Sequence, residues 1–170
     1  MSGHSKWSQI KHKKGITDKK KSQIFSKLSR LITLAARKGT DPKINSELAR
    51  AIEHARSFNM PGDNIERAIK KVADKNQAQL EELSVEALGP GGIALQIKAI
   101  TDNRNRTLSE IRKILSDFEA KMVQPGSIQW LFDQPPVSIE NAELQNRIDK
   151  LFEALDDQDE VEDIVSNLSE

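Results

Sequence analysis

The spacing of apolar residues changes once along this 170-residue chain, near residue 80. Before that point apolar residues recur every three or four positions, as they do on one face of an α-helix. After it they alternate with other residues over 83–87 and again over 93–100, as in a β-strand. A helical period followed by a strand period predicts an all-helical unit and then an α+β unit.

Three amphipathic helices are predicted in the first part. The first has its apolar face at Ile24, Leu28, Leu31, Ile32 and Ala35, and Gly39 ends it. The second is predicted to begin at Asp41-Pro42, an N-cap followed by proline, with the stripe Ile44, Leu48, Ala51, Ile52 and Ala55. The third starts near Pro61, with Ile65, Ala68, Ile69 and Val72 on its apolar face. Short connections between three such helices predict a small bundle.

The second part is predicted to contain four strands and two helices. After the strands at 83–87 and 93–100, the spacing of Thr107 and Glu110 indicates a capping box that starts a helix. Alternation at Ile128, Trp130 and Phe132 predicts a strand, and a helix over 144–155 and a strand over 161–165 follow. The order β-β-α-β-α-β predicts an α+β sandwich with an antiparallel or mixed sheet and helices on one side. Residues 74–79 are polar and act as a linker, so the expected domains are 1–75 and 80–170.

Charge is divided between the two parts, although the formal net charge is zero. Residues 1–75 hold 18 Lys and Arg against 7 Asp and Glu, and the remainder is correspondingly acidic. Residues 1–16 show no hydrophobic periodicity and are interpreted as a basic arm, flexible when unbound. A basic N-terminal part followed by an acidic part predicts that the basic part binds a polyanion.

The cations of the arm and the first helix are the first candidate site. Lysines neutralise phosphates, Trp7 can stack on a base, and His12 can donate to phosphate when protonated. Because lysines outnumber arginines here, contact with the backbone is expected rather than base reading. The alternative is a solvated basic tail that aids solubility. The predicted nucleic-acid-binding residues are Lys6, Trp7, Lys11, His12, Lys13, Lys14, Lys19, Lys20, Lys21, Lys27 and Arg30.

The segment Thr101–Thr107 is a second candidate. Arg104 and Arg106 lie between a predicted strand and a helix N-terminus, a position that favours anions. The alternative is a polar loop whose asparagines satisfy local backbone groups. The residues alone leave both interpretations open.

Several other classes of site find little support in the sequence. Gly89-Pro90-Gly91-Gly92 lacks a following Gly-Lys-Ser/Thr and precedes a strand, so a hairpin turn is expected there. There is no cysteine, the three histidines lack the spacing of a metal pair, and no serine elbow is present. We therefore expect no enzyme activity, cofactor or metal. The acidic end is expected to be a solvated surface, because it lacks the ligand spacing of an EF-hand.

Membrane insertion is also not expected. No apolar run approaches the roughly 18 residues needed to span a bilayer, and no secretory signal follows the basic N-terminus. A soluble, cytoplasmic protein is the expectation.

Ordered motifs across residues 3–132 resemble the YebC family. They are Gly3-His4-Ser5-Lys6-Trp7, Ile10–Lys14, Ile24–Leu28, Asn59–Lys70, Gly89–Gly92, Thr101–Thr107 and Gly126-Ser127-Ile128. The family includes proteins described as probable transcriptional regulators and organellar translational activators. The resemblance implies a third lobe inserted between the strand at 127–132 and the C-terminal helix. Residues 133–139 join these elements directly, so the chain resembles a short form that lacks this lobe.

Together, charge and resemblance predict a nucleic-acid-binding regulator of gene expression. The main hypothesis is a DNA-binding transcriptional regulator. The alternative is a ribosome-associated translation factor that binds ribosomal RNA and assists synthesis of difficult stretches, such as proline-rich ones. A third hypothesis is a scaffold whose basic N-terminal part binds an acidic protein. A further alternative is a protein partner bound through the acidic α+β domain, and no oligomeric state is predicted.

Overall fold

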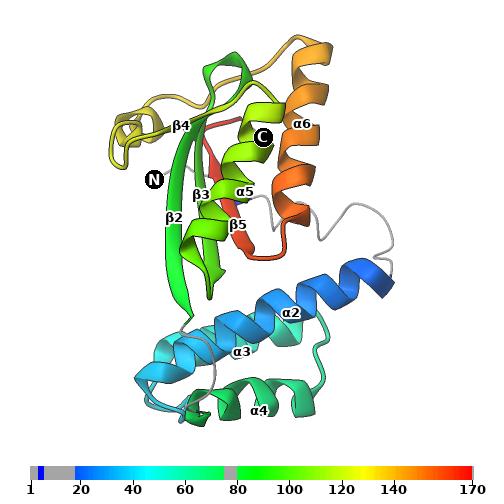
Figure 1. Ribbon diagram of the computed structural model, residues 1–170, viewed down its shortest axis with the longest axis vertical. Helices are drawn as coiled ribbons and strands as arrows, with labels where there is room; N and C mark the ends of the chain where they lie inside the picture. The colour runs from blue at the N-terminus through cyan, green and yellow to red at the C-terminus, as the bar shows by residue number, and fades with distance from the viewer. Residues whose placement is uncertain (1–3, 6–17, 75–79, 170) are drawn as a thin grey trace. The chain divides into compact units, whose positions relative to one another are not determined.

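The computed structural model describes residues 4–5, 18–74 and 80–169. The chain divides into two compact units. The helical unit comprises residues 15–81, and the α+β unit comprises residues 82–170 together with the first fourteen residues of the chain. Figure 1 shows the elements of each unit.

The helical unit contains the three predicted helices. They are α2 (Asp18–Ala35), α3 (Ser46–Ser57) and α4 (Gly62–Lys70), and the short 3-10 helices η1 (Ala36–Lys38) and η2 (Lys71–Ala73) extend α2 and α4. Helix α2 packs against both α3 and α4. The predicted apolar stripes supply its core, which includes Ile24, Leu28, Ile32, Leu48, Ala51, Ile52, Ala55, Ile65 and Ala68.

The predicted start of the second helix is wrong. Asp41 accepts a hydrogen bond from the Lys43 amide at 2.9 Å and forms a turn, and the helix begins only after Asn45. The Asn45 side chain accepts from the Leu48 amide at 3.1 Å and donates to the Ala35 and Gly39 carbonyls. Ile44 consequently lies before the helix and is 83% exposed, outside the buried stripe in which we placed it.

The α+β unit contains both strands and helices, which follow one another along the chain. The strands are β1 (His4–Ser5), β2 (Glu81–Leu88), β3 (Ala94–Thr101), β4 (Lys121–Val123) and β5 (Val161–Ser166). The helices are α5 (Arg104–Asp117) and α6 (Ala142–Asp157), with the 3-10 helices η3 (Pro90–Gly92) and η4 (Gln129–Asp133).

Its described strands form one sheet in the order β1-β5-β3-β2-β4. The pairs β1/β5, β3/β5 and β2/β4 are antiparallel. Helices α5 and α6 cover one face of the sheet, as Figure 1 shows, which confirms the predicted α+β class. His4 and Ser5 were expected in a flexible arm, and that expectation is wrong for these two residues, because they pair with β5.

A main core fills the space between the sheet and the two helices. It includes Leu95, Ile97, Ile111, Leu151 and Leu155. A second cluster of Ala94, Ile128 and Phe132 is formed by β3 and the segment around η4. Ile128 and Phe132, together with Trp130, are the residues from which we predicted a strand at 128–132, and that prediction is wrong. Ile128 and Phe132 are buried four positions apart, whereas Trp130 is 59% exposed, so the segment follows a helical and not a strand pattern.

Candidate nucleic-acid interface

A groove lies between α2 and the α4 side of the helical unit. Its volume is about 620 Å³. Helix α2 provides one wall with Asp18, Lys21, Ser22, Phe25, Ser26, Ser29 and Arg30. The opposite wall comes from Met60, Asn64, Arg67 and Lys71. We call this feature the α2/α4 groove.

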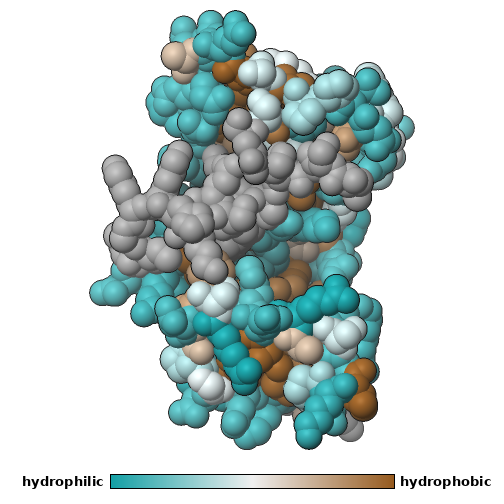
Figure 2. Space-filling model, turned by 180° about the vertical axis from the view of Figure 1, so that it is seen from behind, coloured by the Kyte–Doolittle hydropathy of each residue, from teal (hydrophilic) through white to brown (hydrophobic). Residues whose placement is uncertain are grey.

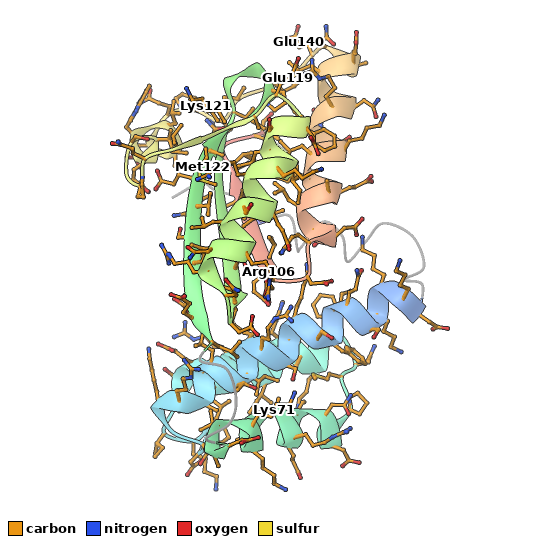
Figure 3. The ribbon with its side chains drawn as sticks, in the orientation of Figure 1. Lys71, Arg106, Glu119, Lys121, Met122 and Glu140 are labelled. Atoms are coloured by element: carbon orange, nitrogen blue, oxygen red, sulfur yellow. The ribbon has the colours of Figure 1, made fainter. Side chains whose placement is uncertain are left out.

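Four of the lining side chains are cationic and one is acidic. Lys21 is exposed, and its Nζ lies 5.8 Å from the centroid of the Phe25 ring. Arg67 donates from Nε to the Asp63 carbonyl at 3.3 Å and from Nη2 to Asn64 Oδ1, which orients its guanidinium. Lys71, labelled in Figure 3, is exposed and makes no ion pair with any residue that the structure describes. The excess of cations favours an anionic ligand.

The groove also contains hydroxyl and apolar groups. Ser22, Ser26 and Ser29 follow one another at helical spacing along α2. Phe25 is half-buried and Met60 is buried. On the face of the helical unit seen in Figure 2, apolar side chains are visible between hydrophilic ones. The groove can thus offer charge, hydrogen-bonding groups and an aromatic surface to one ligand.

A buried threonine holds the two walls together. The Thr33 hydroxyl of α2 lies 2.8 Å from the Ala68 carbonyl of α4 and 2.9 Å from the Ser29 carbonyl of its own helix. Thr33 is 5% exposed, so these contacts are shielded from water. The packing of α4 on α2 therefore fixes where Arg67 and Lys71 stand opposite Lys21.

The structure separates the predicted cations of α2. Lys21 and Arg30 line the groove, whereas Lys19 and Lys20 on the same helix do not. Lys27 is 2% exposed and does not line the groove, so no groove contact supports its predicted role in phosphate binding. Six further predicted residues lie outside the described part of the chain, namely Lys6, Trp7, Lys11, His12, Lys13 and Lys14.

Sequence reasoning missed Arg67 and Lys71. Both lie on the third helix or at its end, where we considered only the apolar face. A signal was present, because cations at positions i and i+4 share one face of a helix.

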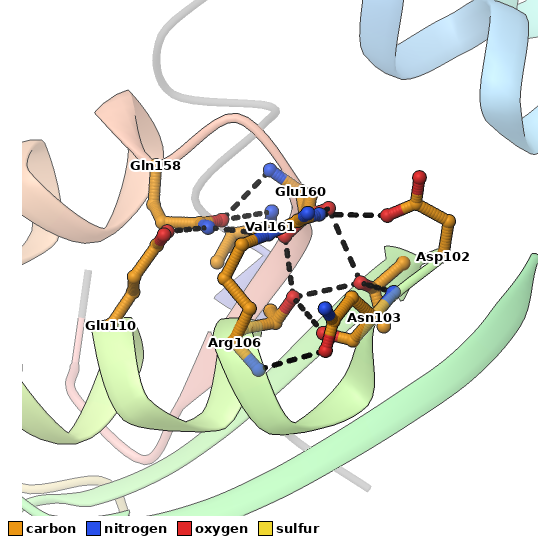
Figure 4. Close-up of polar contacts among 9 residues, drawn as sticks. Asp102, Asn103, Arg106, Glu110, Gln158, Glu160 and Val161 are labelled. Carbon is orange, nitrogen blue, oxygen red and sulfur yellow. Dashed lines mark hydrogen bonds and ion pairs between the residues drawn. The ribbon is translucent and has the colours of Figure 1, made fainter.

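The second candidate segment forms a hydrogen-bond network within the α+β unit, drawn in Figure 4. Glu160 is buried, and its carboxylate accepts from Arg106 and from the hydroxyls of Thr101 and Thr107. Arg106 also donates to Asp102 Oδ1 at 2.7 Å. The network therefore ties the connection between β3 and α5 to the connection between α6 and β5.

Our capping-box prediction for Thr107 is wrong. Asn103 caps α5 by accepting a hydrogen bond from the Arg106 amide at 3.1 Å, so the helix starts one turn earlier. Thr107 is fully buried and uses its hydroxyl in the network instead. The spacing of threonine and glutamate therefore correctly indicated a capped helix start in this region, but it identified the wrong capping residue.

Arg106 is engaged in this network through Asp102 and Glu160, although its side chain is 47% exposed. Hydrogen bonds to Asp102 and Glu160 raise the pKa of its guanidinium above its ordinary value. Arg104, in the first turn of α5, is exposed. Of the two alternatives for this segment, the contacts of Arg106 favour the structural one.

A glycine motif also has a structural explanation. The buried Glu86 carboxylate of β2 accepts from the Gly126 amide at 2.9 Å, and Gly126 has a φ of 85°. Only glycine adopts this conformation without strain. Glu86 thereby fixes the turn that places Ile128 in the second core cluster.

Comparison with known proteins identifies the family. A model of the TACO1/YebC protein N-terminal domain matches residues 5–75, and a model of the TACO1/YebC second and third domain matches residues 80–138. The chain belongs to the TACO1/YebC family. The resemblance inferred from the sequence motifs is thus confirmed.

Relatives of this TACO1/YebC chain are named as regulators. A probable transcriptional regulatory protein of Petrotoga mobilis is 46% identical over 155 residues, covering 89% of this chain and 61% of the relative. One of Pseudothermotoga lettingae is 44% identical over 170 residues, covering 94% and 67%. The chain therefore spans about three fifths to two thirds of the length of these curated relatives.

A solved structure supports the fold. The crystal structure of a conserved hypothetical protein, Aq1575 from Aquifex aeolicus, aligns with a TM-score of 0.83 at 29% identity, covering 96% of each chain. In the described residues of our chain, 134–141 join η4 to α6 without an intervening helix or strand. None of the described helices is both long and apolar enough to cross a membrane.

Proposed function

We propose that this chain is a nucleic-acid-binding regulator of gene expression, most simply a DNA-binding transcriptional regulator. The observation that carries the proposal is the α2/α4 groove, where Lys21, Arg67 and Lys71 converge from two helices. Cations gathered in a groove bind phosphates and release counterions. The names of the relatives agree with this function. The proposal includes no catalytic step.

The N-terminal arm extends the proposed interface along the chain. Its lysines precede Asp18, which lines the groove at the start of α2. Changing Lys11, Lys13 and Lys14 together to Ala is expected to lower the affinity for nucleic acid and reduce the dependence of affinity on salt. Unchanged affinity and an unchanged salt slope would show that the arm is not an anchor.

A translation factor bound to ribosomal RNA is the second candidate. The row of serine hydroxyls in the groove favours it, because a hydroxyl can donate to and accept from the 2′-hydroxyl that distinguishes RNA from DNA. Lysines alone favour neither nucleic acid.

Crosslinking in cells tests the two candidates against each other. The full chain is crosslinked, the bound nucleic acid is sequenced, and ribosome co-sedimentation is measured in parallel. Enrichment at promoters without ribosome association supports the transcriptional regulator. Ribosome association without promoter enrichment supports the translation factor. Recovery of neither nucleic acid contradicts both and favours a scaffold that binds an acidic protein.

A further inference from the structure

We propose that the α2/α4 groove binds single-stranded nucleic acid, with phosphates on Lys21, Arg67 and Lys71 and an unpaired base against Phe25. The inference rests on the nucleic-acid binding proposed above and adds the strandedness of the ligand and the residues that contact it. It argues against a duplex lying in this groove.

The volume of the groove favours a single strand over a duplex. The groove has a volume of about 620 Å³ and lies where two packed helices meet. The major groove of B-DNA alone is about 12 Å wide, so a whole duplex is too broad to enter a cavity of this volume. A duplex can contact only the rim, whereas part of a single strand can lie along the groove.

The side chains inside the groove are those that a single strand uses. A cationic groove that follows the backbone and an aromatic ring that accepts a base are the two components of single-strand binding sites. Lys21 and Phe25 stand one helical turn apart on α2, and Lys71 faces them from the other wall. A paired base has no face available for Phe25, so a duplex would leave the ring unused.

The length of the polar track sets the size of the ligand. Ser22 and Ser29 are separated by seven residues of α2, which is about 10 Å at 1.5 Å per residue. This length corresponds to about three stacked nucleotides at 3.4 Å each. Asp18 adds a negative charge to the same lining at the start of α2, where it repels a phosphate.

Binding of labelled oligonucleotides to the full chain, measured by fluorescence anisotropy over a range of salt, tests the inference. The probes are oligo(U) and oligo(dT) of about 12 nucleotides and a mixed-sequence DNA duplex of equal length. Removing two single-strand phosphate contacts by Arg67→Gln with Lys71→Gln should reduce the salt slope by about 1.4. Affinity for both single strands should fall about tenfold or more.

Lys70→Gln is the matched control. Lys70 neighbours Lys71 and carries the same charge, but its Nζ lies 4.0 Å from Glu66 Oε2 and it does not line the groove. We expect Lys70→Gln to leave the affinity within about twofold of the original value. Phe25→Leu should weaken binding without changing the salt slope, and Asp18→Asn should strengthen binding. Circular dichroism verifies that each variant folds.

The outcomes separate this inference from the proposed function. If the unaltered chain binds none of the probes, nucleic-acid binding itself is overturned. If it binds but the Arg67/Lys71 variant behaves like Lys70→Gln, the groove is overturned and the function stands. Tighter binding of the duplex than of either single strand overturns the inference that the ligand is single-stranded. A preference for oligo(U) identifies RNA as the ligand, and one for oligo(dT) identifies DNA, and either supports the groove.

Discussion

Thr33 on α2 contacts the carbonyl oxygen of Ala68 on α4 at 2.8 Å. This bond joins the two walls of the α2/α4 groove inside the core, because Thr33 is 5% exposed. Thr33→Val removes the hydroxyl at nearly constant shape. We expect a loss of about 1 kcal/mol in the unfolding free energy of the helical unit. Amide hydrogen exchange in α2 and α4 measures this loss of stability. The control is Thr40→Val, a change at an exposed position. Equal protection of the amides in the two variants would contradict a stabilising role for the Thr33 hydrogen bond.

Asn45 caps α3 and also holds the end of the preceding helical segment. Asn45→Ala removes the acceptor for Leu48 and the donor to Ala35 and Gly39, so we expect a loss of about 2 kcal/mol in unfolding free energy. Asn45→Asp keeps the cap but loses the donor. Urea unfolding of both variants separates the two contributions. If Asp restored full stability, the cap alone would account for the effect.

Glu160 connects α5 to the entry of β5 through Thr107 and Arg106. Glu160→Gln removes the charge from these hydrogen bonds, and we expect about 2 kcal/mol less stability in the α+β unit. Hydrogen exchange of the β3 and β5 amides reports on this unit specifically. The control is Glu153→Gln, an exposed change on α6 that should leave the exchange rates nearly unchanged.

Gly91 and Gly92 form a matched pair in the turn before β3. Both have positive φ values, 72° and 77°. A Cβ on Gly91 would lie 2.9 Å from Leu144 Cδ2, whereas one on Gly92 would meet nothing within 4 Å. Alanine should therefore cost about 1 kcal/mol at Gly92 from backbone strain. At Gly91 it should cost about 1 kcal/mol more from the contact with Leu144. Thermal unfolding of the two variants compares these costs, and equal melting temperatures would rule out the contact.

Elements with a long hydrophobic stripe were predictable from the sequence. Ile24, Leu28 and Ile32 are buried at helical spacing, and Leu95 and Ile97 are buried at strand spacing. Burial of a continuous apolar face determines both elements, and the spacing of apolar residues in the sequence indicates which residues form that face. The predicted strand at 128–132 failed because three apolar residues are too few to distinguish a strand from a helical turn. Strand β4 was missed because it has only three residues.

Helix starts and the candidate site depended on choices that local sequence does not determine. Asp41 and Asn45 are both good N-caps, and the contacts of Asn45 with Ala35 and Gly39 decide between them. Lys21 and Lys27 are both cations of one helix, yet only Lys21 lines the groove. Arg67 and Lys71 join Lys21 only through the packing of α4 on α2. Tertiary contacts, which no single helix encodes, therefore assemble the candidate site.

The pairing of β1 with β5 changes how the connectivity is understood. His4 lies opposite Ser166, so the chain contributes a strand to the α+β sheet before it enters the helical unit. The helical unit is then an excursion between β1 and β2, joined to the sheet by two covalent connections and not one. A single cut in either connection leaves it attached through the other. A permuted chain that begins in the second connection and links the present ends would keep every strand of the sheet.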